Sequence, residues 1–428
     1  MLGIQKTSEF KPSNLGIKFL YIGVLVLPTA PAIALLSLIF SLLLSSNNNP
    51  INFFKEKSNK YFIIISFLMI LSCIVNSFDN SNKIIEEIGS LSWISLINWI
   101  PFFWLFWSFE PYLKEIRVRK AIAKFLLIGT IPVIFSGFLQ YFFNITGPFE
   151  ILNGLIIWYQ RPLSITDGIT GPFNNANYAG AWLALVWPFS FSLFITNKNK
   201  FKKLITTLFC LLFITALLLT NSRNAWLGMF LTIPVIIGFE YIFWLIPLII
   251  LIGLFLTFLI SLIPDYLREN LVSFLTINIF NNFPENSLSL QEAFPRLNIW
   301  SFSIKAIFER PLFGWGGGTF PVIHKAINGR WIGHTHNIIL ELAINYGILT
   351  SLILSITVFR YLEKYYKFII LNSKTTLEKI KNNLTFEKAW FASILFISYS
   401  HLFDIQYFDL RISIITWILL TGLKASMI

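Results

Sequence analysis

Long apolar runs divide the chain of 428 residues, and most of them are long enough to cross a lipid bilayer. A transmembrane helix needs about 20 predominantly apolar residues. Runs of this length lie at residues 61–78, 91–109, 125–145, 179–196, 204–221, 338–358, 389–405 and 410–427. Because lipid cannot satisfy backbone hydrogen bonds, such runs are expected to form helices. The sequence therefore predicts an all-α, polytopic membrane protein.

The composition supports this prediction. Apolar residues make up 55% of the chain and charged residues only 13%, whereas soluble domains carry about a quarter charged residues. A soluble single domain, a disordered tail and a coiled coil are excluded. Cys73 and Cys210 lie inside apolar runs, so neither a disulfide framework nor a thiolate metal site is expected. The first apolar stretch, residues 17–44, is longer than the core of a cleavable signal peptide.

Two apolar blocks need more than their length to be interpreted. Residues 225–263, at ~1.5 Å per residue, extend roughly 60 Å as a helix and fit two spans. Residues 17–44 contain Pro28 and Pro31 and fit either one kinked span or a pair of short ones.

The basic connections settle the predicted topology. Residues 110–124, 197–203 and 359–388 are the most basic short connections, so the positive-inside rule places them in the cytoplasm. If the lysine-containing N-terminus is also inside, residues 17–44 cross twice. The result is about 12 transmembrane helices, with both termini cytoplasmic. The net charge of +12 then lies on the inner face, next to membrane lipids, and a nucleic-acid partner loses its support.

The topology divides the chain into four parts. These are N-terminal spans (1–124), central spans with two polar outer turns (125–263), a periplasmic loop (264–337) and C-terminal spans with a basic cytoplasmic loop (338–428). Within the outer loop, Pro295 is predicted to begin a surface helix that ends at Pro311, with Trp300 and Phe302 as interfacial anchors. The glycine run that follows lacks the Lys-Ser/Thr ending of a phosphate-binding P-loop, and a turn is favoured.

Arginine and lysine are distributed differently between the two faces. The predicted inner segments carry mostly lysine, whereas arginine dominates the outer set of Arg161, Arg223, Arg268, Arg296, Arg310, Arg330 and Arg411. The planar guanidinium group suits bidentate binding of phosphate or carboxylate. We therefore predict that the outer face binds an anion. The alternative is that some of these arginines pair with nearby carboxylates.

The sequence His334-Thr-His-Asn337 stands directly before a helix that enters the membrane from outside. Polar groups at this depth are candidates for function. A helix N-terminus disfavours imidazolium, so His336 is a candidate general base. Asn337 and Glu341, four residues apart, are predicted to orient its imidazole. The alternatives are a His-x-His metal pair, which has few further ligands, and exposed histidines beside a helix cap formed by Thr335 or Asn337.

Two further outer turns carry candidate residues. Arg223 lies in a tight turn between apolar runs, where it either binds a ligand or extends to the membrane interface. Asn174 and Asn177 belong to an Asn-rich segment before another span. Their amides are predicted either to line a sugar site or to cap the helix.

Taken together, these motifs resemble the O-antigen ligase / O-antigen polymerase family. The resemblance covers roughly residues 150–425 and rests on Gly171–Tyr178, Asn221–Trp226, Arg296-x-x-x-Trp300, Arg310–Gly316 and His334–Asn337. It implies a multi-pass glycosyltransferase of the bacterial inner (plasma) membrane that serves polysaccharide biosynthesis for the cell envelope. Such enzymes take a glycan from a polyprenyl-diphosphate donor at the periplasmic face and pass it to a lipid or glycan acceptor.

The resemblance also implies roles for individual residues. His336 would be the general base on the acceptor hydroxyl, with His334 in a supporting role, and Arg223 and Arg296 would hold the donor diphosphate. No cofactor and no metal is expected, because guanidinium groups and a helix N-terminus can neutralise the leaving diphosphate. An inverting displacement would follow.

Other functions remain open at this stage. The family includes O-antigen polymerases and cyanobacterial relatives described as inorganic-carbon transporters, so a bicarbonate transporter or transport accessory is an alternative. Transporters usually place polar groups or broken helices at the bilayer midplane, often in repeated halves. The chain has few charges in mid-span and no pair of matching halves is evident. A scaffold for envelope assembly is the third possibility.

Overall fold

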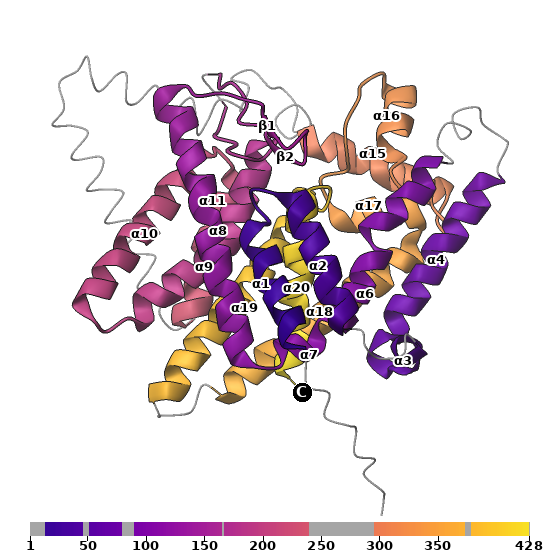
Figure 1. Cartoon of the computed structure of the whole chain (residues 1–428). Helices are drawn as coiled ribbons and strands as arrows, with labels where there is room; N and C mark the ends of the chain where they lie inside the picture. Colours follow the sequence, from indigo (N-terminus) through magenta and orange to yellow (C-terminus); the bar gives the residue numbers. More distant parts are fainter. Residues whose placement is uncertain are drawn as a thin grey trace, which may run out of the picture.

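The computed structural model describes residues 13–45, 51–78, 90–164, 167–238, 295–372 and 378–427. These residues form helices that run between two ends of a bundle, with one small β-hairpin (Figure 1). The second span predicted within 225–263 and the first part of the predicted periplasmic loop lie outside the described residues. Helices dominate, so the predicted all-α fold is confirmed.

The first apolar block forms two short helices, α1 (Asn14–Val26) and α2 (Pro31–Ser45). They are antiparallel, because the Ser37 hydroxyl donates to the Phe19 carbonyl and the Ser41 hydroxyl to the Gly16 carbonyl, both at 2.8 Å. A Cβ added to Gly23 would lie 2.6 Å from the Leu38 side chain, so glycine permits this close packing. The alternative of one kinked span is therefore excluded.

Long helices follow. They are α4 (Lys60–Ser77), α6 (Ile100–Ser108), α8 (Ile116–Phe143), α9 (Ala176–Thr196), α10 (Lys200–Leu219), α11 (Arg223–Ile237), α18 (Ile348–Asn372), α19 (Glu378–Ser400) and α20 (Leu410–Ser426). Short helices are α3 (Ile51–Lys55), α7 (Glu110–Leu113) and the 3-10 helices η1 (Lys57–Asn59) and η2 (Leu96–Asn98). Among the described residues, five helical segments are long and apolar enough to cross a membrane. The total of 12 spans stays a prediction.

One predicted span is broken. Residues 338–358 form α17 (Ile338–Tyr346) and the start of α18, which are separated by Gly347 with φ +90°. A Cβ at Gly347 would lie only 2.0 Å from the Leu312 carbonyl oxygen. The outer segment before the glycine run thus packs against the break, and the Ile348 N–H donates to the Pro311 carbonyl at 2.9 Å. The residues on both sides of Gly347 are mostly apolar, so hydropathy alone does not reveal the break.

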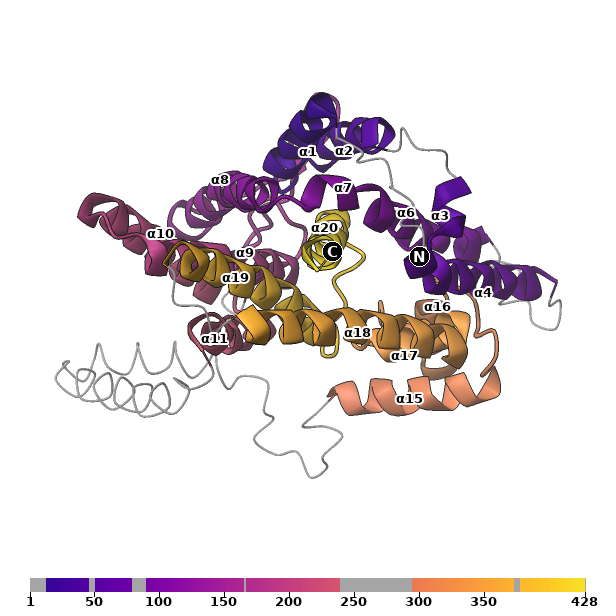
Figure 2. The ribbon, with the colours of Figure 1, turned by 90° about the horizontal axis from the view of Figure 1, so that it is seen from below.

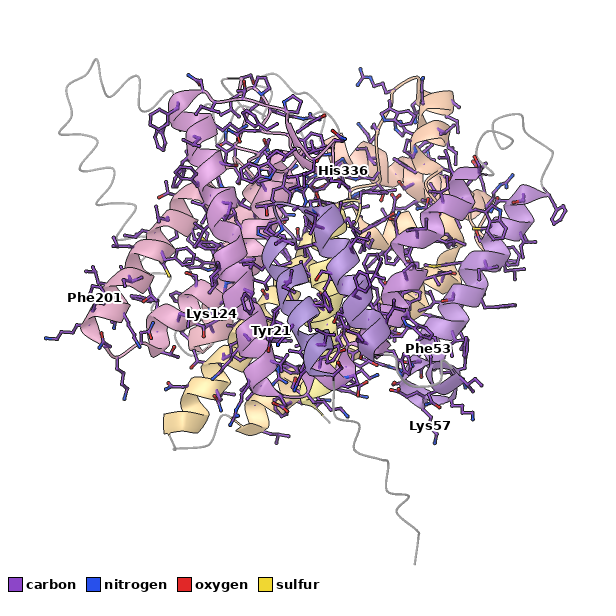
Figure 3. All side chains as sticks on the ribbon, viewed as in Figure 1. Tyr21, Phe53, Lys57, Lys124, Phe201 and His336 are labelled. Carbon is purple, nitrogen blue, oxygen red and sulfur yellow. The ribbon has the colours of Figure 1, made fainter. Side chains whose placement is uncertain are left out.

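Helix α20 lies at the centre of the bundle, with the other helices arranged around it (Figure 2). Nearly all of its residues are buried. Lys57 lies at one end of the bundle and His336 lies toward the other, while Lys124 of α8 lies between them, nearer the end that carries Lys57 (Figure 3). This arrangement is the one that a positive-inside topology requires.

The end of the bundle that carries His336 also holds the β-hairpin and two further helices (Figure 1). These are the antiparallel strands β1 (Phe149–Ile151) and β2 (Ile156–Trp158), with Glu150 opposite Ile157, and the helices α15 (Pro295–Glu309) and α16 (Phe320–Asn328). Helix α15 is the predicted surface helix. Trp300 and Phe302 were predicted to be interfacial anchors; both are half-buried and contact the protein, and the anchor role stays a prediction. Trp300 Nε1 donates to the Thr335 carbonyl at 3.0 Å, and Phe302 packs on Phe320 and His324.

The glycine run after α15 forms a turn packed on α17. The backbone N–H groups of Trp315 and Gly316 donate to the carbonyls of Ile344 and Asn345, and that of Gly317 donates to the Ser92 hydroxyl. These groups are already paired within the protein, which argues against a phosphate cradle and agrees with the turn favoured from the sequence.

Candidate functional site

The loop before α17 presents His336. Asn337 is the N-cap of α17, and its Oδ1 accepts from the backbone N–H groups of Ile339 and Leu340 at 2.9 and 3.1 Å. Its Nδ2 donates to the Leu402 carbonyl at 3.1 Å. His336 itself has φ +56°, a left-handed conformation that is uncommon for residues other than glycine. The loop is thus held in a specific shape at the point where the imidazole projects.

Asp404 holds the His336 imidazole. Nδ1 of His336 lies 3.0 Å from Oδ1 of Asp404, whose side chain is 7% exposed, while the histidine side chain is 28% exposed. An ionised carboxylate accepts a hydrogen bond only from a protonated Nδ1, so Nε2 is left able to take up a proton. The pair therefore has the arrangement of a general base and the group that orients it.

The state of Asp404 follows from its surroundings. Helix α19 ends at Ser400, so Asp404 lies in the connection to α20, outside the helices. Burial opposes ionisation, but the hydrogen bond from His336 and the neighbouring His334 and Arg296 hold the pKa of Asp404 below its usual value. The carboxylate is therefore ionised at neutral pH.

Asn337 and Glu341 do not orient the imidazole, and that part of the prediction is wrong. Asn337 caps α17, as described above. Glu341 is fully buried and accepts from the Thr335 backbone N–H at 2.9 Å and from Asn345 Nδ2 at 3.1 Å. Both shape the loop rather than contact the imidazole. Sequence analysis missed Asp404, which is 68 residues from His336. The sequence did contain one indication of it: Asp404 is an ionisable residue near the predicted outer end of the apolar run 389–405, and such residues are candidates for function.

His334 supports the loop from the other side. Its ring centroid lies 4.2 Å from that of His336, and its Nδ1 accepts from the His336 backbone N–H at 3.2 Å. Burial, reinforced by His336 and Arg296 and opposed by Asp404, lowers the pKa of His334 to about 4. The ring is therefore neutral at physiological pH, as its acceptor role at Nδ1 requires.

Arg296 lies near this pair. It is exposed in the first turn of α15, and its charge lowers the pKa values of both His334 and Asp404. The hydrogen bond from Trp300 to Thr335 ties the same helix to the loop. The structure therefore brings the predicted Arg296 and His336 to one region.

Arg223 begins α11 and is exposed. The next residue, Asn224, donates through Nδ2 to the Ser400 hydroxyl at 2.8 Å. The start of α11 is thus bound to the end of α19, immediately before the connection that carries Asp404. Arg223 accordingly lies on an element that adjoins the site, and its contact with a ligand stays a prediction.

The Asn-rich segment contains one cap and one unpaired amide. Asn175, rather than Asn174 or Asn177, caps α9, because its Oδ1 accepts from the Asn177 backbone N–H at 2.7 Å. Oδ1 of Asn174 is buried and has no hydrogen-bond partner among the described residues. The sugar-site role of Asn174 and Asn177 stays a prediction.

Arg411 illustrates the alternative of internal pairing. Its guanidinium group forms an ion pair with Asp409, donates to the Pro172 carbonyl at 3.2 Å and lies 3.8 Å from the Phe173 ring centroid. This buried arginine joins α20 to the segment before α9. Its contacts are therefore structural, whereas Arg223 and Arg296 are exposed.

The site also bears on the metal prediction. His334, His336 and Asp404 each offer a ligating atom, and these atoms all lie within 4.8 Å of one another. However, Nδ1 of His336 already bonds to Asp404 and Nδ1 of His334 already accepts from the backbone. The hydrogen bonds favour a site that works without an ion, which stays a prediction.

Fold and site together define a helical membrane protein with a His–Asp pair at one end of its bundle, beside exposed arginines. Residues 208–355 match the family model described as O-antigen ligase, a range that includes Arg223, Arg296 and His336. The chain is also similar to a ComP-specific O-oligosaccharyltransferase of Acinetobacter baylyi. The two are 29% identical over 185 residues, which cover 41% of the chain and 32% of the relative. The chain thus spans about a third of that protein's length. These findings confirm the resemblance to the O-antigen ligase family.

Proposed function

We propose that the chain is an O-antigen ligase-like glycosyltransferase. It moves a glycan from a polyprenyl-diphosphate donor to a lipid or glycan acceptor at the periplasmic face of the bacterial inner membrane. The observation that carries this proposal is the hydrogen bond between His336 and Asp404 beside Arg296. The family match over residues 208–355 supports the same class of reaction.

His336 acts on the acceptor in this proposal. With Nδ1 bonded to Asp404, Nε2 removes the proton from an acceptor hydroxyl as its oxygen attacks the anomeric carbon of the donor sugar. A bond forms between that oxygen and the anomeric carbon, while the bond from the carbon to the diphosphate oxygen breaks. The proton ends on His336, where the Asp404 carboxylate stabilises the imidazolium.

Arg223 and Arg296 act on the leaving group. The departing polyprenyl diphosphate gains negative charge, and guanidinium groups stabilise that charge through bidentate hydrogen bonds. Both arginines are exposed. Attack on the face opposite the diphosphate gives an inverted anomeric configuration. Two guanidinium groups supply the positive charge that a divalent ion supplies elsewhere, so no metal is required.

The distribution of basic residues indicates which side of the membrane the site faces. Lys57 lies at the end of the bundle opposite His336, and Lys124 lies nearer that end than His336 does (Figure 3). Under the positive-inside rule that end is cytoplasmic. His336 then faces the periplasm, where lipid-linked glycans are available to it, and both termini are cytoplasmic.

Substitution of the three central residues tests the proposal. His336→Ala, Arg223→Ala and Arg296→Ala proteins should insert normally but transfer about 10²–10⁴-fold less glycan, the usual contribution of a general base or a charge-stabilising group. Arg330→Ala, at another exposed outer arginine, is the matched control and should transfer normally. Wild-type glycan products from the His336→Ala protein would refute the proposal. A product that grows by repeated units would identify a polymerase rather than a ligase.

A further inference from the structure

A cavity of about 470 Å³ lies directly behind the candidate site. It is bounded by α17, α18, α19 and α20, and its walls are almost entirely apolar. Ile338, His401 and Leu402 line its outer part. Ile338 follows the His336–Asn337 pair, and His401 and Leu402 precede Asp404, so the cavity and the His–Asp pair share two short segments of chain.

The cavity extends inward from this point. Its lining on α18 runs from Leu354 to Leu362, and on α20 from Ser413 to Leu420, which corresponds to roughly 10 Å at about 1.5 Å per residue. At its rim, Phe359 is 65% exposed and Leu402 is 36% exposed. Apolar side chains exposed on a bundle of this kind face lipid. A hydrocarbon chain therefore has both a path into the cavity and room within it.

Two polar atoms of the cavity lining lack hydrogen-bond partners among the described residues. They are His401 Nε2 and Thr416 Oγ1, and both are buried. An unpaired buried polar group is unfavourable. Most of the remaining wall is apolar. A mostly hydrocarbon ligand with one oxygen acceptor fills such a space and pairs with one of these two groups.

We propose that this cavity binds a fatty acyl chain of a membrane glycerolipid. The chain fills the apolar space, and its ester carbonyl accepts a hydrogen bond from the Thr416 hydroxyl or from protonated Nε2 of His401. The isoprenoid tail of a donor lipid carries no oxygen along its chain, so it would leave both groups unpaired. The polar atoms therefore favour the acyl chain over the isoprenoid.

A bound acyl chain also supports the site. The His401 carbonyl accepts from the Ile338 backbone N–H at 2.9 Å, a bond that joins the start of α17 to the end of α19. Asp404 is three residues further along. A chain packed against Ile338 and His401 stabilises this junction, and with it the approach of Asp404 to His336. The bound lipid stabilises the position of Asp404 and does not take part in the transfer reaction.

Photolabelling of the full chain in lipid nanodiscs tests the proposal. The probe is a phosphatidylethanolamine with a diazirine in the middle of one acyl chain, and labelled peptides are mapped by mass spectrometry. Ser355 lines the cavity, whereas Ile356, the next residue on α18, does not and is 48% exposed. Ser355→Phe should reduce labelling of the lining residues about tenfold by occupying the space. Ile356→Phe should leave labelling unchanged, and equal labelling of both variants would overturn the proposal.

A second pair of variants tests the polar contact. Thr416→Val preserves shape but removes the hydroxyl, and Thr416→Ser restores it. Weaker labelling with valine than with serine supports the contact between the ester and Thr416, and equal labelling overturns the contact with Thr416. A polyprenyl phosphate with a diazirine in its tail is used as a second probe, for comparison with the acyl probe. If that probe labels the lining residues and the acyl probe does not, the acyl assignment is refuted.

Binding and transfer are measured separately. The His336→Ala protein should keep wild-type acyl labelling, because His336 does not line the cavity. A failure of the glycosyltransfer proposal therefore leaves the labelling result intact. Conversely, absence of acyl labelling in an active wild-type protein refutes the lipid site alone.

Discussion

The Asp404→Asn substitution tests the central geometry of the site. Asparagine has nearly the same shape as aspartate, and at this position it can still accept from the Ile405 backbone N–H, which lies 3.0 Å from Oδ1. The substitution removes the negative charge 3.0 Å from His336 Nδ1. The same Oδ1 position faces both the Ile405 N–H and His336 Nδ1. If the amide turns, its NH2 group loses the bond from Ile405 and donates to Nδ1, which places the imidazole proton on Nε2, the tautomer that cannot act as a base.

Two effects set the size of the expected loss. A hydrogen bond to a charged group contributes about 1.5–3 kcal/mol, which corresponds to roughly 10- to 150-fold in rate at about 1.4 kcal/mol per factor of ten. Stabilisation of the wrong tautomer adds to this loss, and the matching substitution in a Ser-His-Asp triad costs about 10⁴-fold. We therefore expect kcat to fall by about 10² to 10⁴-fold. KM for the donor should change little, because Asp404 is buried behind the imidazole.

The assay is transfer of a lipid-linked glycan by purified protein in nanodiscs. Asp167→Asn is the matched control, since Asp167 is an exposed carboxylate that accepts from Ser164. Thermal unfolding of both variants checks that the fold is intact. If Asp404→Asn keeps more than about a tenth of the wild-type kcat with normal folding, the charge on Asp404 does not support a general base, and the proposed role of the pair is wrong.

Further predictions concern pH, ions, backbone and transport. The depressed pKa of His334, about 4, means that the folded state binds fewer protons than the unfolded state between about pH 4 and 6.5. The contribution of His334 to stability is therefore full above that window and should fall by up to about 3 kcal/mol as pH drops through it. Thermal unfolding of wild type and His334→Gln measures it: the variant should lose this contribution and keep that of His401, whose pKa burial also lowers to about 4. Chelation with EDTA should leave transfer unchanged, whereas a loss restored by a divalent ion would assign an ion to the cluster at His336. Gly347→Ala should destabilise the protein by about 1–3 kcal/mol or more, because its positive φ and the Leu312 carbonyl exclude a Cβ, and denaturation in detergent gives the difference. Proteoliposomes should show no bicarbonate flux above that of empty vesicles, and flux that persists in His336→Ala would favour transport.

The helices were predictable from the sequence because hydropathy is a local property. Runs of apolar residues identified α4, α9 and α10 closely, and the balance of lysines favoured two helices rather than one in residues 17–44. Helix α8 begins at Ile116, within the basic segment predicted as a connection. The break at Gly347 was not predictable in this way. It depends on the Leu312 carbonyl, which packs against the break from a separate segment of chain.

The site was predictable only where it is local. The His-Thr-His-Asn sequence indicated His336, but the prediction that Asn337 and Glu341 orient the imidazole relied on the helical face that these two residues share. His336 precedes the helix and has φ +56°, so a shared face of the helix does not bring either side chain to its imidazole. Its partner Asp404 comes from another connection, and only tertiary structure brings the two together.

The arginine asymmetry of the outer face now separates into two kinds of role. Arg411 forms a buried ion pair with Asp409, and Arg310 donates to Asn76 and lies over Trp315. These side chains connect elements of the bundle. Arg223 and Arg296 are exposed at the starts of α11 and α15, where helix dipoles add positive potential. Under the proposed function, an anion that approaches His336 is expected to meet guanidinium groups on these two helices, whose starts are bound to neighbouring segments through Asn224 and Trp300. The site thus depends on the docking of both helices as well as on its own side chains.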